Sequence, residues 1–284
     1  MPDTVVTLGA ALDAAAETLG AARIPEPRRE ALRIWSGTWR TPLSDAYLAR
    51  EQVIDADRVV ALEAAVARRA GGEPLAYVTG WTGFRRLLLR TDRRALIPRP
   101  ETEGLVDLVL ARVPCGRVAD IGTGTGCIAL SLAAEGGYDE VVAVDASTEA
   151  LTLAGENALD TGLRVTLVAG DLTHPLAASS CDGVVSNPPY LTDAEYATLD
   201  PAVREWEPRL ALPSGGDGLE ATARLLDDAR RVVRPGGWLA LEVDCTRGAE
   251  AARRATALGW RDPTLHPDLF GRVRYLLAQW RPQA

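Results

Sequence analysis

Helical spacing of apolar residues dominates the first quarter of the chain. Between Leu8 and about Ala70 the apolar positions recur every three or four residues, as at Leu12, Ala15 and Leu19, which is the pattern of amphipathic helices. Prolines interrupt this pattern and glycines at 71 and 72 follow it, and both residue types end helices. The pattern predicts a small N-terminal helical domain over residues 1–72.

The periodicity then changes twice. From Leu75 to Leu96 apolar and polar positions alternate as in strands, around a turn at Trp81 to Gly83, so we expect a hairpin linker over residues 73–97. From residue 98 to 284, short β-branched runs alternate with helical segments, which favours a mostly parallel, doubly wound α/β sheet. The predicted strands are Val118–Ile121, Val141–Val144, Val165–Val168, Gly183–Val185, Trp238–Val243 and Val273–Trp280.

Composition and charge narrow the class of protein. The 284 residues are 47% hydrophobic and 25% charged, as in ordinary globular proteins. The net charge of -8 argues against broad binding of nucleic acid phosphates. No apolar run reaches the roughly 18 residues that cross a bilayer, and the N-terminus lacks a signal-peptide pattern. We therefore expect a cytoplasmic protein with neither a membrane nor a nucleic acid as its partner.

Cysteine and histidine are too scattered to predict a metal centre. The four cysteines form no CxxC pair, and His174 and His266 are far apart, so neither a metal site nor a disulfide framework is expected. All basic residues are arginine, and asparagine occurs only at Asn157 and Asn187. An asparagine within a motif is therefore more informative here than in an average sequence.

A glycine-rich turn, DIGTGTG from Asp120 to Gly126, follows the first predicted strand of the α/β region and precedes a predicted helix, Cys127 to Ala134. Glycines let a ligand approach the backbone, and a helix N-terminus offers free N–H groups. Nineteen residues after Gly126, Asp145 ends the second predicted strand. A carboxylate at that place can accept hydrogen bonds from ribose hydroxyls. The turn predicts a nucleotide-like ligand. The GxGxxG pattern typical of nicotinamide enzymes is absent, which counts against a dinucleotide. Alternatively, Asp145 caps the helix that begins near Ser147.

The motif Asn187-Pro188-Pro189-Tyr190 directly follows the apolar run Gly183 to Ser186, the fourth predicted strand. Its two prolines exclude helix and ladder bonding and fix an extended loop with exposed carbonyls. The Asn187 amide oxygen and a proline carbonyl can then accept from one NH2 group, while Tyr190 stacks on it. Such a site suits methylation of a planar nitrogen, because two acceptors orient it and stabilise developing positive charge without a strong base. An ordinary turn at a strand end is the alternative.

In these motifs the chain resembles the HemK/PrmC-type family of release-factor glutamine methyltransferases, and the likeness covers nearly the whole chain. The matching segments occur in the family's order: Glu73–Gly80, Phe84, Leu96–Glu103, Asp120–Gly126, Ser186–Tyr190, Glu207-Pro208, Gly215–Leu219 and Pro235–Gly237. The resemblance implies a Rossmann-like, seven-stranded class I methyltransferase domain that uses S-adenosylmethionine and releases S-adenosylhomocysteine. It also implies a preceding helical domain that helps to hold the release factor.

The resemblance implies roles for individual residues as well. The glutamine of a Gly-Gly-Gln motif would bind at Asn187, Pro188, Pro189 and Tyr190, which carry the catalysis, with Phe84 and Arg99 at the mouth of the site. S-adenosylmethionine would bind at Asp120, Gly122, Thr123, Gly124, Thr125, Gly126, Asp145, Asp171, Leu172 and Asn187. For four of these residues other roles stay open: core packing for Phe84 and Leu172, a turn for Asp171 and a surface ion pair for Arg99.

Two departures from the family pattern leave the substrate open. Arg247 stands where the family often has glutamine, and a late acidic-then-basic pair reads Arg272-Val273-Arg274; neither is expected to touch the chemistry. Three other functions remain as alternatives: N6-adenine methylation of DNA or RNA, glutamine methylation of another protein, and cofactor binding without catalysis.

Overall fold

Residues 6–112 and 115–281 are described by the computed structural model, and they form two compact units. The first unit contains the chain up to Trp81 together with Asp200–Trp206, and the second contains Thr82–Leu199 and the chain from Glu207 onward. The domain boundaries expected from the sequence, at residues 72 and 97, stay predictions.

The first unit is helical, as the spacing of its apolar residues predicts. Hydroxyl and carboxylate caps begin two of its helices, where Thr7 Oγ1 accepts from the backbone N–H of Ala10 and Asp55 Oδ1 from that of Arg58. The apolar faces of the first two helices bury Leu19 and Ile34 completely. Its elements are β1 (Val6–Thr7), α1 (Leu8–Ala21), α2 (Pro27–Trp39), α3 (Leu43–Leu48), β2 (Val53–Ile54), α4 (Ala56–Ala70), α5 (Leu75–Thr79) and α10 (Pro201–Trp206).

The linker segment differs from its sequence prediction. Residues 75–79 form the one-turn helix α5, and the hairpin consists of β3 (Trp81–Phe84) and β4 (Leu87–Arg90), so the predicted turn at Trp81 to Gly83 is wrong. The left-handed conformation of Gly80 ends α5, and the guanidinium of Arg68 donates to the carbonyls of Tyr77 and Val78. This tertiary capping stabilises a helix that alternation alone does not indicate.

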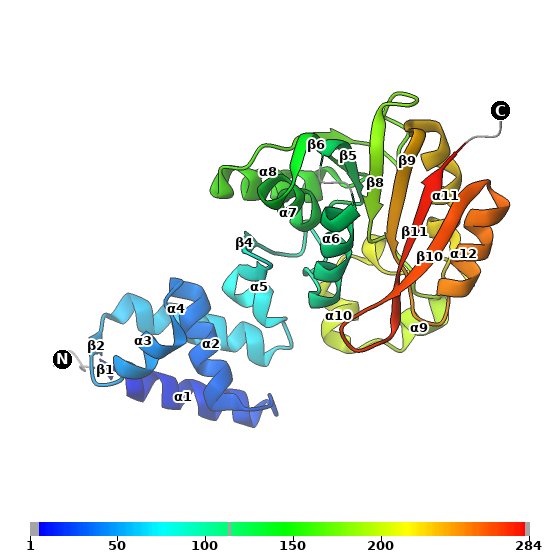
Figure 1. Cartoon of the computed structure of the whole chain (residues 1–284). Helices are drawn as coiled ribbons and strands as arrows, with labels where there is room; N and C mark the ends of the chain where they lie inside the picture. The colour runs from blue at the N-terminus through cyan, green and yellow to red at the C-terminus, as the bar shows by residue number, and fades with distance from the viewer. Residues whose placement is uncertain (1–5, 113–114, 282–284) are drawn as a thin grey trace. The chain divides into compact units, whose positions relative to one another are not determined.

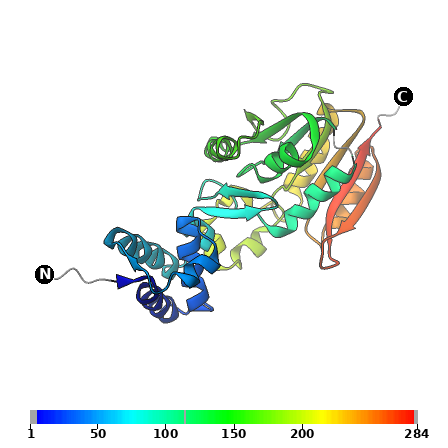
Figure 2. The ribbon, with the colours of Figure 1, turned by 60° about the vertical axis from the view of Figure 1, so that its left-hand side comes forward.

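A seven-stranded sheet forms the centre of the second unit, in the order β10-β11-β9-β8-β5-β6-β7 (Figure 1). The strands are β5 (Cys115–Ile121), β6 (Gly137–Asp145), β7 (Thr166–Ala169), β8 (Cys181–Ser186), β9 (Val233–Glu242), β10 (Trp260–Pro267) and β11 (Val273–Trp280). Those from β9 to β7 pair in parallel, and β11 is antiparallel to both of its neighbours. Figure 2 shows the β10–β11 pair, in orange and red, at one edge. The sequence pattern missed β10, because its prolines and register shifts interrupt the alternation.

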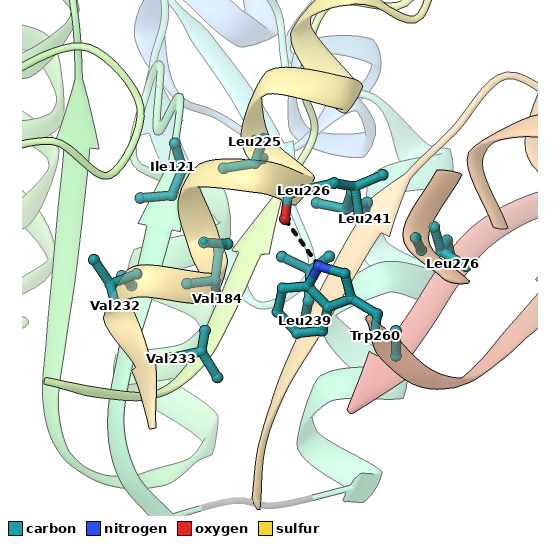
Figure 3. Packing of buried hydrophobic residues seen from close by; sticks show 14 of the residues in the cluster. Ile121, Val184, Leu225, Leu226, Val232, Val233, Leu239, Leu241, Trp260 and Leu276 are labelled. Carbon is teal, nitrogen blue, oxygen red and sulfur yellow. Dashed lines mark hydrogen bonds between the residues drawn. The ribbon is translucent and has the colours of Figure 1, made fainter. Parts of the chain in front are cut away.

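Helices cover both faces of this sheet. The helices of the second unit are α6 (Pro100–Arg112), α7 (Cys127–Glu135), α8 (Thr148–Thr161), α9 (Asp193–Ala197), α11 (Glu220–Val232) and α12 (Gly248–Ala257), and it also contains the 3-10 turn η1 (Arg209–Ala211). In the core on one face, the indole Nε1 of Trp260 donates to the carbonyl of Leu226 at 2.8 Å (Figure 3). Since β6 and β8 flank β5 on opposite sides, a crevice is expected at the carboxyl end of β5. None of the helices in residues 6–112 and 115–281 has the length and apolar character of a membrane span.

The close packing between β8 and β9 leaves no room for a side chain at residue 183. Gly183 lies opposite Trp238, and a Cβ atom at residue 183 would lie 2.1 Å from carbons of the indole. We expect Gly183→Ala to lower the free energy of unfolding by about 1–3 kcal/mol, the usual cost of overpacking. Thermal unfolding measures this change, with Gly83→Ala as the control because its added Cβ meets no atom within 4 Å. Equal melting temperatures for the two variants would contradict the packing argument.

Candidate active site

The glycine-rich turn connects β5 to α7 at the predicted crevice. Gly122 and Gly126 have φ angles of 72° and 82°, a region that glycine adopts without the Cβ penalty. The backbone N–H groups of Gly122 and Thr123 donate to the carbonyl of Val144 at 2.8 and 3.0 Å, which ties the turn to β6. A Cβ at residue 122 would meet no atom within 4 Å. The backbone at Gly122 is therefore open to a ligand.

Asp120 supports this turn from behind. Its side chain is fully buried, and Oδ2 accepts from Thr123 Oγ1 at 2.6 Å and from the backbone N–H of Ala129 at 3.1 Å. Burial raises the pKa of Asp120 to about 7, because an ionised carboxylate is poorly solvated there. Asp120, Thr123 and the buried Thr125 thus fix the shape of the turn.

Asp145 joins the turn to the next helix. Its Oδ2 accepts from the backbone N–H of Gly124 and its Oδ1 from that of Ser147, both at 2.9 Å. The N-cap of α8 is Ser147, whose hydroxyl accepts from Ala150 N at 3.1 Å. Helix capping, the alternative role considered for Asp145, is therefore performed by Ser147.

A cavity of about 650 Å³ opens over these residues. Of the positions predicted for the cofactor, those that line it are Gly122, Gly124, Asp145, Asp171, Leu172 and Asn187. Open space over the glycine turn beside a carboxylate fits the adenosine part of S-adenosylmethionine. Asp171 also forms an ion pair with Arg224, which lines the same cavity. Leu96 and Pro208 also line the cavity and belong to segments matched in the sequence, whereas Ala95, Arg209, Leu210 and Ala211 line it without belonging to any sequence motif.

The Asn187–Tyr190 motif follows β8 at the wall of this cavity. Ser186 Oγ donates to the carbonyl of Ile121 at 2.6 Å, which holds the start of the loop against β5. Asn187 and Pro189 line the cavity, Pro188 is buried and Tyr190 is half-buried. Burial and, next, the Glu242 carboxylate raise the pKa of Tyr190 to about 12, so its phenol is protonated at neutral pH.

Two residues predicted at the mouth of the site make internal contacts. Phe84 is 1% exposed and packs in the core on one face of the sheet. Arg99 donates to the buried carboxylate of Glu207 at 2.6 Å, and the same carboxylate accepts from the backbone N–H of Ile97. The substrate roles of Phe84 and Arg99 stay predictions.

The two departures from the family pattern have defined places. Arg247 binds the carboxylate of Glu195 at 2.7 Å and the carbonyl of Asp217 at 3.0 Å, so it fixes the loop before α11. Arg274 lies nearer to the chemistry than the sequence suggested, because its charge acts on both Tyr190 and Glu242.

Thr102 and Glu242 lie next to the Asn187–Tyr190 motif, and the sequence analysis assigned neither of them to the site. Asn187 Nδ2 donates to Thr102 Oγ1 at 3.1 Å, and Thr102 Oγ1 donates to Glu242 Oε2 at 2.7 Å. Glu242 is an acidic residue within the apolar run that forms the end of β9. A carboxylate in that apolar run was the one available signal, since such a group is rarely fully buried unless it has a polar partner.

Known proteins resemble this chain over nearly its full length. The family model described as PrmC N-terminal domain matches residues 10–80, and the one described as Methyltransferase small domain matches residues 102–206. The release factor glutamine methyltransferase of Moorella thermoacetica is 42% identical over 98% of this chain and 100% of its own length. That of Nitratidesulfovibrio vulgaris is 38% identical over 96% and 95%. The crystal structure of a methyltransferase from Pyrococcus furiosus shares the fold, with a TM-score of 0.53 and 20% identity over 68% of this chain and 89% of its own.

Proposed function

The chain belongs to the release factor glutamine methyltransferase family, and from this premise we propose that it methylates the side-chain amide nitrogen of the glutamine in the Gly-Gly-Gln motif of a peptide chain release factor. S-adenosylmethionine is the proposed methyl donor and supplies an electrophilic methyl group. The observation that carries the proposal is that Asn187 shares one cavity wall with Gly122 and Asp145. Acceptors for the amide thus adjoin the surface proposed for the cofactor.

Some residues of the cavity would bind the cofactor, and others would orient the glutamine amide. Asp145 would accept hydrogen bonds from ribose hydroxyls, and the open backbone at Gly122 would allow close approach of the cofactor. Asn187 Oδ1 and the Pro188 carbonyl would accept the two N–H bonds of the glutamine amide. Because the amide lone pair is delocalised, these acceptors stabilise the positive charge that develops on nitrogen as the methyl group arrives. Tyr190 is neutral and would pack against the amide plane.

Methyl transfer from labelled S-adenosylmethionine to purified release factors tests this function. We expect label on the wild-type release factor and none when the motif glutamine is replaced by asparagine. With Asn187→Ala in the enzyme, we expect label to form about 10²- to 10³-fold more slowly. Absence of label on every release factor, with cofactor bound, would overturn the proposed substrate. DNA and RNA in parallel reactions test the adenine-N6 alternative, which the net charge of -8 disfavours.

A further inference from the structure

A buried chain of hydrogen bonds reaches Asn187 from two other elements of the second unit. It runs from the Asn187 amide to the hydroxyl of Thr102 on α6 and from there to the carboxylate of Glu242 at the end of β9, at 3.1 and 2.7 Å. Thr102 is 2% exposed and Glu242 is 1% exposed. Solvent therefore cannot readily replace either partner.

The Glu242 carboxylate determines which group donates in each of these two hydrogen bonds. An ionised carboxylate can only accept, so the Thr102 hydroxyl must donate its single proton to Glu242. The lone pairs of that hydroxyl then face Asn187, which must present its NH2 group to them. Consequently, the amide oxygen of Asn187 is the end left for the substrate.

We propose that Thr102 and Glu242 are positioning residues that hold the Asn187 amide in the orientation required for methyl transfer. This inference rests on the proposed function, because the required orientation is the one that presents an acceptor to a substrate N–H. An amide rotated by 180° would present its NH2 group and would repel the amide that it should bind. Hydrogen bonds in series also polarise one another, so the carboxylate makes Asn187 Oδ1 a better acceptor.

Protonation of Glu242 changes the order of donors. Charged and titratable groups face this carboxylate from several elements: Arg99 and Glu101 at the start of α6, Cys127 on α7, Tyr190 in the motif, and Arg274 and Tyr275 on β11. Burial dominates, and it raises the pKa of Glu242 to about 7. Below that pH the carboxyl can donate to Thr102, whose own proton is then free to point at Asn187 and to stabilise the rotated amide. We therefore expect the oriented form to be lost as pH falls through about 7.

Nuclear magnetic resonance can detect this coupling without any substrate. Because the chain has only two asparagines, protein labelled with [15N]asparagine gives two side-chain NH2 pairs, which Asn187→Asp assigns. We expect the Asn187 pair to shift with a midpoint near pH 7. That midpoint should be absent in Glu242→Gln and greatly weakened in Thr102→Val, which keeps the carboxylate and removes the hydroxyl. The fully buried Asn157, bonded to backbone carbonyls of Arg90 and Thr125, reports whether each variant is folded.

Kinetics provide the second readout. At saturating cofactor, Thr102→Val and Glu242→Gln should lower kcat by tenfold or more and change cofactor affinity by less than threefold, whereas Thr102→Ser should keep at least half of the wild-type kcat. In the wild type, kcat should fall as pH decreases below 7, and in Glu242→Gln this fall should be much smaller. The pKa of Asp120 is also raised to about 7. Asp120 is present in every variant, so its contribution to the pH dependence of kcat is the same in all of them.

The proposal is overturned if the Asn187 resonances titrate alike in wild type, Thr102→Val and Glu242→Gln. It is equally overturned if Thr102→Val, folded by the Asn157 signals, methylates at the wild-type rate. A failure of the proposed function is distinct from both results, since it would appear as a wild-type protein that labels no release factor while its Asn187 resonances still titrate through Glu242.

Discussion

Replacing Asn187 with alanine is expected to lower kcat for methyl transfer by about 10²- to 10³-fold, the usual cost of removing one fixed dipole aimed at developing charge. The bond from Asn187 Nδ2 to Thr102 Oγ1 fixes the side-chain amide, and with it the amide oxygen, before the substrate arrives. A water molecule in its place would have to be oriented during the reaction. Single-turnover transfer from labelled S-adenosylmethionine, at saturating cofactor, measures the change.

The control for this variant is Asp193→Asn, which removes a charge at an exposed position three residues after the motif. That variant should keep nearly full activity. Cofactor affinity, measured by calorimetry, should change by only a few-fold in Asn187→Ala, because the glycine turn and Asp145 are intact. Retention of more than a tenth of the wild-type kcat would show that Asn187 is not the principal acceptor.

Local patterns predicted the parts of the site that are contiguous in sequence. The glycine turn follows β5 as expected, and the Asn187–Tyr190 motif follows β8 as expected, because both depend on strand ends and on residues with restricted backbones. The sheet was likewise predictable from its buried parallel strands. These features need no knowledge of which segments meet in space.

The features that escaped prediction depend on tertiary contacts. Thr102 and Glu242 are 140 residues apart in sequence. Thr102 belongs to the matched segment Leu96–Glu103, but nothing in that segment indicates a contact with Glu242. The helix α5 exists where alternation predicted a strand, because Arg68 caps it from α4. Arg274 acts on Tyr190 only because β11 pairs antiparallel with β9, next to the strand that carries the motif.

Replacing Asp145 with alanine is expected to weaken S-adenosylmethionine binding by about 100-fold, because two losses coincide. Charge-assisted hydrogen bonds to the ribose contribute about 1.5–3 kcal/mol each, and the Gly124 N–H would lose the carboxylate that fixes the turn. Asp145→Asn keeps one acceptor and should bind with intermediate affinity. At saturating cofactor, kcat should change by only a few-fold in both variants, since Asn187 and its partners are untouched.

The matched control for Asp145 is Ser147→Ala, which separates cofactor binding from helix capping. Ser147 caps α8 with its hydroxyl, so its loss should lower the free energy of unfolding by about 1 kcal/mol and leave cofactor affinity within twofold. Calorimetric titration and thermal unfolding of both variants give the comparison. Unchanged affinity in Asp145→Ala would mean that the carboxylate only shapes the turn. If Asp145→Ala binds S-adenosylmethionine weakly and Ser147→Ala does not, the loss is due to the Asp145 carboxylate and its bonds to the ribose. Disturbance of the α8 terminus cannot explain such a result, because both variants disturb that terminus.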